Sequence, residues 1–362
     1  MSSLPGQCPG EWPEGAHAVG STRTGKSERA MNSSTLTTPL CRLLGIRVPV
    51  IQAPIGSAAT PELAAATSRA GGLGTLALTW TGPQQAVAQI RRARELADGR
   101  PFAVNLVLDF PIDDVMTVCL NEEVPIVSTF WGDPGDVSGR LHAAGVLHLH
   151  TVGSVEAAER AADSGVDAIV AQGWEAGGHV RGQVSTLALV PAVVDAVAPV
   201  PVIAAGGIAD GRGLAAVLAL GAQAGWLGTR FLTALEAATH EVYRAAVLRA
   251  APQDAVHTRC FDGGWPHAPH RSLRNSTLTA WEAAGSPAAP NRPGEGVIVA
   301  TDSQGRTHQR YADMVPIPGM TGDVEALALY AGQSAGLVRD TLTAERIVAS
   351  ICDQAERITS GA

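Results

Sequence analysis

The sequence has few aromatic residues, few cysteines and no long apolar run. Aromatic side chains make up 4% of the 362 residues, whereas glycine, alanine and valine are abundant. This balance favours closely packed helices on a parallel sheet over an all-β sandwich. No uninterrupted apolar stretch approaches the roughly 18 residues that a membrane-spanning helix requires, and no apolar signal-peptide core lies near the start. We therefore expect a soluble, cytoplasmic protein with no membrane partner.

The cysteines and the charge exclude further classes of protein. The five cysteines lie far apart in the chain and form no CxxC pair. Their odd number and wide spacing indicate reduced thiols rather than a disulfide framework or a metal site. The formal net charge is −8, and no block rich in lysine or arginine is present. This charge argues against a nucleic-acid partner.

The first 38 residues differ from the rest of the chain in composition. They are rich in glycine, proline, serine and threonine and show no hydrophobic periodicity. Such a composition is typical of disorder. We interpret residues 1–38 as a disordered extension without a function, and Met31 as a plausible alternative start.

From Arg47 onwards, short β-branched runs alternate with Ala-rich helical patterns. The runs are nearly all apolar, which is typical of strands that are buried on both faces of a parallel sheet. Eight of them occur in sequence, at 48–54, 73–80, 102–108, 124–131, 145–152, 166–173, 200–207 and 224–231. Eight strands in βα order predict a (β/α)8 TIM barrel. An open, doubly wound sheet is the alternative, because periodicity does not reveal closure.

The rhythm stops after the eighth strand. Residues 236–334 contain a Pro- and His-rich loop and further apolar runs, which is too much structure for a simple connection. We interpret this segment as an insertion, or lid, that folds over the mouth of the barrel. The barrel itself would comprise residues 39–235 and 335–357, with the last barrel helix at about 335–357.

Candidate binding residues collect where the predicted strands end, which is where TIM barrels form their active sites. A Gly-Gly turn ends strand seven at Gly207, and a Gly-Thr turn follows strand eight at Gly228 and Thr229. Glycine-rich turns at these two strands present backbone N–H groups and a helix N-terminus to a phosphate. The amides of Asn105 and Gln172 are either satisfied at the barrel rim or contact the donor and acceptor edge of a flavin.

The stretch "AQGWEAGGHVRG" (171–182) places His179 behind two glycines. It is either a tight surface turn or a loop that brings an imidazole close to a bound molecule, since glycine allows close approach and histidine titrates near neutral pH. Glu175 would orient His179 or, as we prefer, remain solvated. His148 and His150 either line the barrel interior or, as we prefer, are satisfied core side chains. His267, His270 and Arg271 belong either to a lid that touches the substrate or to a surface loop.

Several of these segments together resemble the nitronate monooxygenase family, formerly called 2-nitropropane dioxygenases. The resemblance runs from about Arg47 to Val348 and rests on "QAPIG", "FAVNLVL", "TVGSVEAAERAADSGVDAIVAQGWEAGGHVRG", "VPVIAAGGIADGRGLAAVLALGAQAGWLGTRFL" and "YAGQSAGLV". It implies an FMN-dependent TIM-barrel enzyme that oxidises nitronates, derived from nitroalkanes, with dioxygen. The family also contains NADH:quinone reductases and is related to FMN-dependent enoyl-ACP reductases. An NAD(P)H-dependent FMN reductase of quinones or enoyl thioesters is therefore the alternative.

The resemblance also implies roles for particular residues. His179 would be the catalytic base, and the flavin contacts would be Asn105, Gln172 and Gly177. The ribityl phosphate would be held by Gly207, Trp226, Leu227, Gly228 and Thr229. Three positions depart from the family pattern: Ile55 stands where many members have methionine, Trp226 where many have glutamine, and Val180 separates His179 from Arg181. The resemblance leaves the oligomeric state open.

Overall fold

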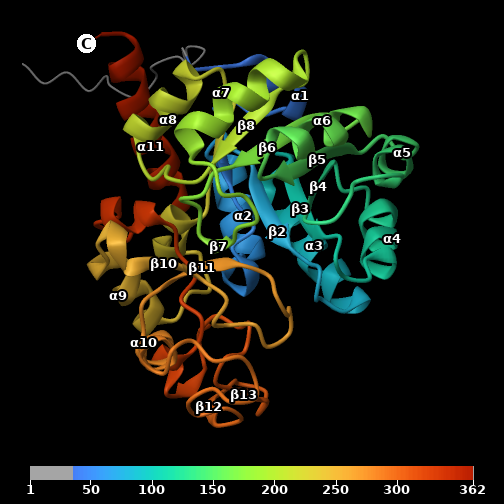
Figure 1. The fold of residues 1–362 in the computed structure, drawn as a ribbon. Helices are drawn as coiled ribbons and strands as arrows, with labels where there is room; N and C mark the ends of the chain where they lie inside the picture. The colour runs from blue at the N-terminus through green and yellow to red at the C-terminus, as the bar shows by residue number, and fades with distance from the viewer. Residues whose placement is uncertain (1–35, 362) are drawn as a thin grey trace, which may run out of the picture. The chain divides into compact units, whose positions relative to one another are not determined.

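A parallel eight-stranded sheet forms the centre of the protein in the computed structural model, which describes residues 36–361 (Figure 1). The strands follow the order β1-β9-β8-β6-β5-β4-β3-β2. Ile51 of β1 also bridges Leu73, directly before β2, so the two ends of this order meet. The sheet is therefore a closed barrel. The prediction of a (β/α)8 TIM barrel is confirmed, and the open-sheet alternative is wrong.

Each of the eight apolar runs contains one barrel strand, and nearly every strand residue is buried. The strands are β1 (Val50–Gln52), β2 (Gly74–Ala77), β3 (Phe102–Val107), β4 (Ile126–Phe130), β5 (Leu147–Val152), β6 (Ala168–Gln172), β8 (Val202–Ala205) and β9 (Ala224–Leu227). Successive side chains alternate between two clusters, because a strand has a period of two. Ile51 and Trp226 belong to a cluster inside the barrel, whereas Val50 and Leu227 pack outwards against the helices.

Helices follow the strands and cover the outside of the barrel. They are α2 (Pro61–Arg69), α3 (Pro83–Ala97), α4 (Asp113–Asn121), α5 (Val137–His142), α6 (Val155–Asp163), α7 (Thr186–Val197), α8 (Gly211–Ala219) and α11 (Ala344–Thr359). Side-chain caps begin several of them, such as Thr60 at α2 and Ser154 at α6. The last helix, α11, packs against α8 and α2 and completes the ring. It begins at Ala344 rather than at about 335, because the chain first makes a 3₁₀ turn (η5, Gln333–Leu337) and Thr343 then caps the helix.

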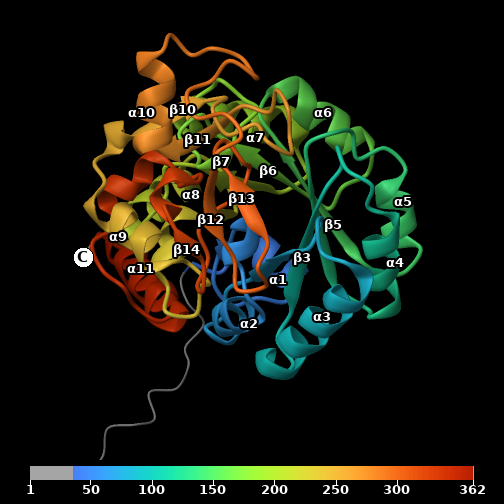
Figure 2. The same cartoon turned by 90° about the horizontal axis from the view of Figure 1, so that it is seen from below.

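The segment between β9 and α11 folds into two small antiparallel sheets and two helices. Its elements are α9 (Glu241–Arg249), β10 (Ala255–Thr258), β11 (His270–Leu273), α10 (Ser276–Ala283), β12 (Ile298–Thr301), β13 (Thr307–Gln309) and β14 (Thr321–Gly322). Figure 2 shows β12 and β13 in front of the barrel. One sheet includes β7 (Gly178–His179), which belongs to the loop after β6 and pairs with β11. The segment is thus joined to the barrel by backbone hydrogen bonds.

Helix α1 (Pro39–Leu44) precedes the first strand, and its apolar side chains join the cluster inside the barrel. Thr38 caps this helix and Leu36 is buried, so these residues are ordered parts of the fold. The disorder expected for residues 1–35 concerns a part of the chain outside the described residues. Among residues 36–361, no helix combines the length and the apolar character needed to cross a membrane.

Cysteine thiols are buried throughout the described part of the chain. Cys8 lies outside it, and the other four, Cys41, Cys119, Cys260 and Cys352, form no disulfide with one another. Burial raises the pKa of Cys119, Cys260 and Cys352 to about 12. These three side chains are therefore unreactive thiols at neutral pH, since the thiolate is the nucleophile.

Candidate functional site

A cavity of about 520 Å³ opens at the carboxyl ends of the barrel strands. This is the face at which TIM barrels form active sites, and the volume lies in the range of small-molecule and cofactor sites. Barrel strands and the segment after β9 both contribute to its wall. Of the nine residues expected to contact a cofactor or substrate, eight line it: Asn105, Gln172, Gly177, His179, Gly207, Trp226, Gly228 and Thr229.

Leu227 is the exception among these residues. Its side chain is 1% exposed and packs in the apolar layer between the strands and the helices. The neighbouring Trp226 points to the other side and lines the cavity. The prediction for the stretch 226–229 did not take account of the alternation along β9, which turns Leu227 away from the cavity.

Backbone N–H groups on the turns after β8 and β9 are available to a ligand. Gly207 has φ +75°, a conformation that glycine adopts without strain. Within residues 36–361, the amides of Gly207 and Gly228 donate to no protein acceptor. The N-terminus of α8, in contrast, is already capped, because the Asp210 carboxylate accepts from the amides of Arg212 and Gly213. The expectation that the α8 N-terminus points at a phosphate therefore rests on amides that already have an acceptor, whereas the turn amides remain free as donors.

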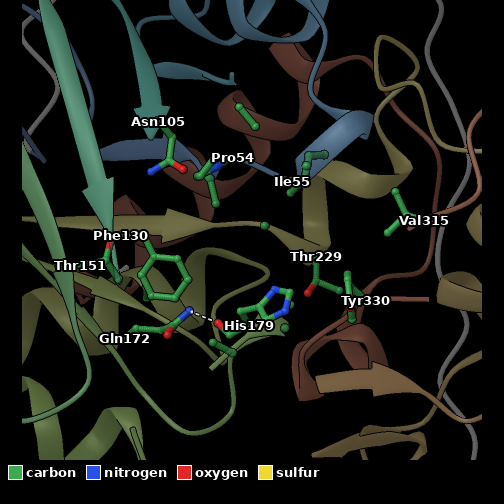
Figure 3. Close-up of a pocket in the computed structure, with 18 of the residues that line it drawn as sticks. Pro54, Ile55, Asn105, Phe130, Thr151, Gln172, His179, Thr229, Val315 and Tyr330 are labelled. Carbon is green, nitrogen blue, oxygen red and sulfur yellow. Dashed lines mark hydrogen bonds between the residues drawn. The ribbon is translucent and has the colours of Figure 1, made fainter. Parts of the chain in front are cut away.

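The two amide side chains differ in how far the protein satisfies them. Asn105 on β3 donates from Nδ2 to the Ser128 hydroxyl at 2.9 Å. Gln172, at the end of β6, donates from Nε2 to the backbone carbonyl of His179 at 3.1 Å (Figure 3). The Gln172 Oε1 atom is buried and has no partner among the described residues. Buried polar atoms are almost always bonded, so this acceptor is available to a donor on a molecule in the cavity.

Glycines in the loop between β6 and His179 are required by the protein's own backbone, in addition to the expected approach to a bound molecule. A Cβ on Gly177 would lie 2.3 Å from the backbone nitrogen of Gly332 and 2.4 Å from the carbonyl carbon of Ala331. Gly178 has φ +71°, the left-handed region. Gly177 is therefore required by a close approach to another backbone segment. Its partner is the chain leading into η5, and the contact fixes the direction in which His179 leaves the loop.

His179 lies in an apolar and aromatic environment at the cavity wall. Its ring stacks at 4.2 Å between centroids on Trp265 and lies 5.5 Å from the ring of Tyr330. Burial, with a smaller contribution from His270, lowers the pKa of His179 to about 3. The imidazole is therefore neutral at physiological pH. Its Nε2 atom is buried and has no hydrogen-bond partner in the described part of the chain.

Asp313 is a functional candidate that the sequence did not reveal. Its Oδ2 atom lies 3.6 Å from Nε2 of His179, and its Oδ1 atom accepts a hydrogen bond of 2.6 Å from the hydroxyl of Tyr330. Burial raises the pKa of Asp313 to about 6, and the bond from Tyr330 counteracts part of that shift. A carboxyl group that titrates near neutral pH thus faces the free nitrogen of a neutral imidazole. Perturbed pairs of this kind are typical of active sites.

Aromatic side chains gather beside the cavity in a protein that has few of them. Phe110 and Trp265 lie 5.2 Å apart between ring centroids, and Trp265 and Trp131 lie 4.9 Å apart. Trp80 joins Phe110 at 5.1 Å and is 58% exposed. These four residues, the aromatic cluster, extend from His179 towards solvent. The cluster provides an apolar surface for a substrate and excludes water from the imidazole.

Glu175 has neither of its expected roles. Its Oε2 atom accepts from the amide of Thr186 at 2.9 Å and from the Thr186 hydroxyl at 3.0 Å. The carboxylate therefore caps the start of α7 and does not orient His179. It is also not simply solvated, since it is half-buried and bonded.

The remaining ionisable candidates are mainly structural. Arg271 is buried and donates to the backbone carbonyls of Trp174, Ala176 and Ala255, so it holds the β6–β7 loop against β10. The preferred interpretation of His148 and His150 as satisfied core side chains is confirmed, because both bond to the hydroxyl of Thr129 at 2.7 Å.

Two histidines of the Pro-rich loop have different environments. His270 is buried, bonded to the carbonyl of Ala268 at 3.0 Å, and accepts from the amide of Phe261 at 3.1 Å. His267 is exposed and has φ +67°. Neither lines the main cavity. The part of this loop that reaches the cavity is Gly264 with Trp265, which the sequence did not single out.

Comparison with known sequences gives one family. A sequence model described as nitronate monooxygenase matches residues 37–116 and 110–354. A Rhodococcus jostii (strain RHA1) protein named as a carboxyl-CoA dehydrogenase of an oxo-octahydroindene is 37% identical over 254 residues, which is 70% of each chain. A probable nitronate monooxygenase of Staphylococcus aureus (strain Newman) is 34% identical over 270 residues, or 62% of this chain and 76% of the relative.

Solved structures agree with this result. FabK from Thermotoga maritima is similar with a TM-score of 0.74 and 32% identity, over 90% of this chain and 98% of that one. A nitroalkane oxidase from Streptomyces ansochromogenes is similar with a TM-score of 0.71 and 31% identity, over 87% and 98% of the two chains. The likeness therefore extends through the barrel and the segment after β9.

Proposed function

Because the chain belongs to the nitronate monooxygenase family of flavin-dependent oxidoreductases, we propose that it binds FMN in the main cavity and oxidises alkyl nitronates with dioxygen. The observation that carries this proposal is His179, a buried neutral imidazole whose free Nε2 atom faces the carboxyl group of Asp313. A nitroalkane has an acidic C–H bond beside its nitro group, and the neutral imidazole would accept that proton where the Asp313 carboxylate stabilises the resulting charge.

The cavity residues fit a flavin with a single phosphate. The free amides of Gly207 and Gly228, with Thr229 beside them, would bind the phosphate group. The unpartnered Oε1 of Gln172 would accept a hydrogen bond from the ring system, and Asn105 would lie at the same edge. No second glycine-rich turn of the kind that binds an adenylate is found in the sequence, which favours FMN over FAD.

The side chains of the protein would supply the proton transfer and the environment. His179 takes the proton from a neutral nitroalkane, and Asp313 stabilises the positive charge that the imidazole then gains. With a preformed nitronate, His179 only orients the anion. The aromatic cluster keeps the site dry, which strengthens these electrostatic interactions. Bound FMN supplies the capacity to accept electrons from the substrate and to pass them to dioxygen.

A second candidate function is the oxidation of an acyl-CoA thioester. It is favoured by the Rhodococcus jostii relative, whose name specifies a carboxyl-CoA dehydrogenase and which is 37% identical over 70% of this chain. A thioester also acidifies the neighbouring C–H bond, so His179 and Asp313 would have the same tasks. The two candidates differ in what must fit outside the main cavity, since coenzyme A is much longer than a nitroalkane.

Anaerobic reduction of the flavin tests these functions. The purified protein is mixed with an alkyl nitronate, with an acyl-CoA or with NADH, and the loss of the yellow colour is followed in a stopped-flow instrument. We expect rapid bleaching by the nitronate and not by NADH. Bleaching by acyl-CoA alone would select the second candidate, and rapid bleaching by NADH would indicate a reductase of quinones or enoyl thioesters. Failure of the nitronate to bleach the flavin would overturn the proposal.

A further inference from the structure

A second cavity, of about 220 Å³, lies beside the main one at the ends of β4 and β5. The two cavities share Phe130 and Thr151 in their walls. The second cavity is therefore on the catalytic face of the barrel and directly next to the reaction site. It is too small for a cofactor, which requires a site of roughly 300 Å³ or more, but its volume suits one polar group of a longer molecule.

Two arginines without a bonding partner line this cavity. Arg160 comes from α6 and Arg181 from the loop after His179. Neither guanidinium makes a hydrogen bond or a salt bridge within residues 36–361. Several other arginine side chains form a close ion pair with a carboxylate, as Arg140 does with Asp113 at 3.0 Å. Two unpaired guanidinium groups at one cavity are notable in a chain with a net charge of −8.

The other charged groups near this cavity leave it positive. Asp133 lies in the wall, and its Oδ1 atom accepts from the amide of Gly135 at 2.9 Å. Glu156 lies one turn before Arg160 on α6 and is affected by its charge, but forms no salt bridge with it. His150 is in the wall as well, and burial lowers its pKa to about 4, so it is neutral. Two cations thus face one carboxylate in the wall.

Trp131 connects the second cavity with the reaction site. Its ring lies under the Arg181 guanidinium at 5.8 Å and is 6.2 Å from the ring of His179. Its backbone has φ +63°, which is a true outlier for a bulky residue. Such strain is retained only where the surrounding structure enforces it, and it is concentrated at functional sites. The strained backbone holds one aromatic ring between the imidazole and the arginines.

We propose that the second cavity binds a phosphate group of the substrate, and that Arg160 and Arg181 are the residues that bind it. This inference deepens the proposed function, on which it rests for placing the reacting carbon at His179. Paired guanidinium groups bind phosphate through charge-assisted, often bidentate hydrogen bonds. A long phosphorylated substrate would use this second cavity and pass over Trp131, whereas an alkyl nitronate would occupy the main cavity alone. Two sources of such a phosphate are a coenzyme A thioester and a nicotinamide dinucleotide phosphate.

Equilibrium binding to the flavin-loaded protein tests the proposal without turnover. The probes for calorimetry are coenzyme A and NADP⁺, neither of which can reduce the flavin, and pantetheine, which lacks the phosphates and the adenosine. We expect coenzyme A or NADP⁺ to bind at least tenfold more tightly than pantetheine. Whichever of the two binds identifies the source of the phosphate. The oxidation of a nitronate is measured separately, so a failure to bind is distinguishable from a failure of the proposed function.

Arginine variants assign the binding to this cavity. Arg160→Gln and Arg181→Gln should each weaken the binding of the phosphorylated probe by about tenfold, the effect of losing one charge-assisted hydrogen bond, and leave pantetheine unchanged. Both side chains are exposed and unbonded, so the variants should fold, which thermal unfolding checks. Arg140→Gln on the neighbouring α5 is the matched control and should bind like wild type. Equal binding of all three probes, or an unchanged affinity in both variants, would overturn the proposal.

Discussion

Two parts of the wall of the main cavity differ in the chemical groups that they present. The part formed by the ends of β8 and β9 presents backbone amides and small residues, with Gly207 and Gly228 as its donors. The other part, which comes mostly from the segment after β9, presents ionisable and aromatic side chains, notably Trp265, Asp313 and Tyr330. His179 is the point at which the two meet, because its strand β7 belongs to a barrel loop and pairs with β11.

This difference suggests that one part of the wall binds the cofactor and the other carries out the reaction with the substrate. Backbone donors are fixed by the barrel and bind an anion without titrating, so the first part suits a permanent cofactor. Side chains carry the protons and determine which substrate fits, and they are exchangeable without rebuilding the barrel. We expect substitutions in the first part to abolish cofactor binding, and substitutions in the second to change rates and pH dependence while the cofactor remains.

The largest effect is expected at Gly207. Gly207→Asp forces a side chain into a left-handed backbone position and adds a negative charge beside the phosphate. The variant should be nearly colourless, whereas wild type should be yellow and release FMN, not FAD, when denatured. Chromatography of the released flavin measures both. Gly165→Asp is the control, since Gly165 has φ +78° and equally open surroundings but lies in a surface turn. A Gly207 variant with full flavin occupancy would mean that the phosphate binds elsewhere.

His179→Asn should retain FMN and lose activity in a way that depends on the substrate. Removing a neutral nitroalkane's proton requires the base, and losing a positioned base typically costs about 10²–10⁴-fold in rate. A preformed nitronate needs no proton removal, so its loss should be clearly smaller. Stopped-flow reduction of the flavin by each substrate, in wild type and variant, separates the two. Equal rates in wild type and variant for both substrates would show that the loop carrying His179 is only a turn.

Asp313 should determine the pH dependence of the reaction with a neutral nitroalkane. Its raised pKa of about 6 means that the carboxylate is charged above that pH and neutral below it. Since the charged form stabilises protonated His179, the rate should fall by about tenfold as the pH falls through 6, an energy of about 1.4 kcal/mol. Asp313→Asn should show the low rate throughout and no step near pH 6.

Tyr330→Phe provides the complementary test of this step. It removes the hydrogen bond that lowers the pKa of Asp313, so the step should move to higher pH while its size is kept. A step that is unchanged in both Asp313→Asn and Tyr330→Phe would assign it to another group.

A separate effect, which does not involve the reaction, concerns the stability of the fold in mild acid. Burial lowers the pKa values of His148 and His179 to about 3, and of His150 and His270 to about 4. The unfolded chain binds protons at these residues near pH 6.5, so the free energy of unfolding should fall as the pH drops below that value. At pH 5.5 the loss is on the order of 1 kcal/mol per histidine. Urea denaturation at pH 7.5 and 5.5 measures it, and equal stability at both would contradict these burial shifts.

The difference between the two parts of the cavity wall also explains which features could be predicted from the sequence. The eight barrel strands and the two glycine turns have local signatures, in apolar runs and in Gly207 and Gly228, and the structure places them as expected. Asp313 has no such signature, because it lies in an irregular loop and approaches His179 only through the folding of the whole segment. Gly177 lines the cavity as expected, but the sequence does not show that the backbone of Ala331 and Gly332 also comes close to it.

The attachment of the segment to the barrel has a consequence for how molecules reach the site. Arg271 bonds two backbone carbonyls across the junction, those of Trp174 and Ala176, and β11 pairs directly with β7. A segment tied in this way does not swing open as a hinged flap would. Trp80 lines the cavity and is exposed to solvent, so we expect molecules to enter past it. Rotation of exposed side chains takes picoseconds to nanoseconds, whereas flap motions take microseconds or longer. If rotation of Trp80 is all that entry requires, entry of the substrate should not limit turnover.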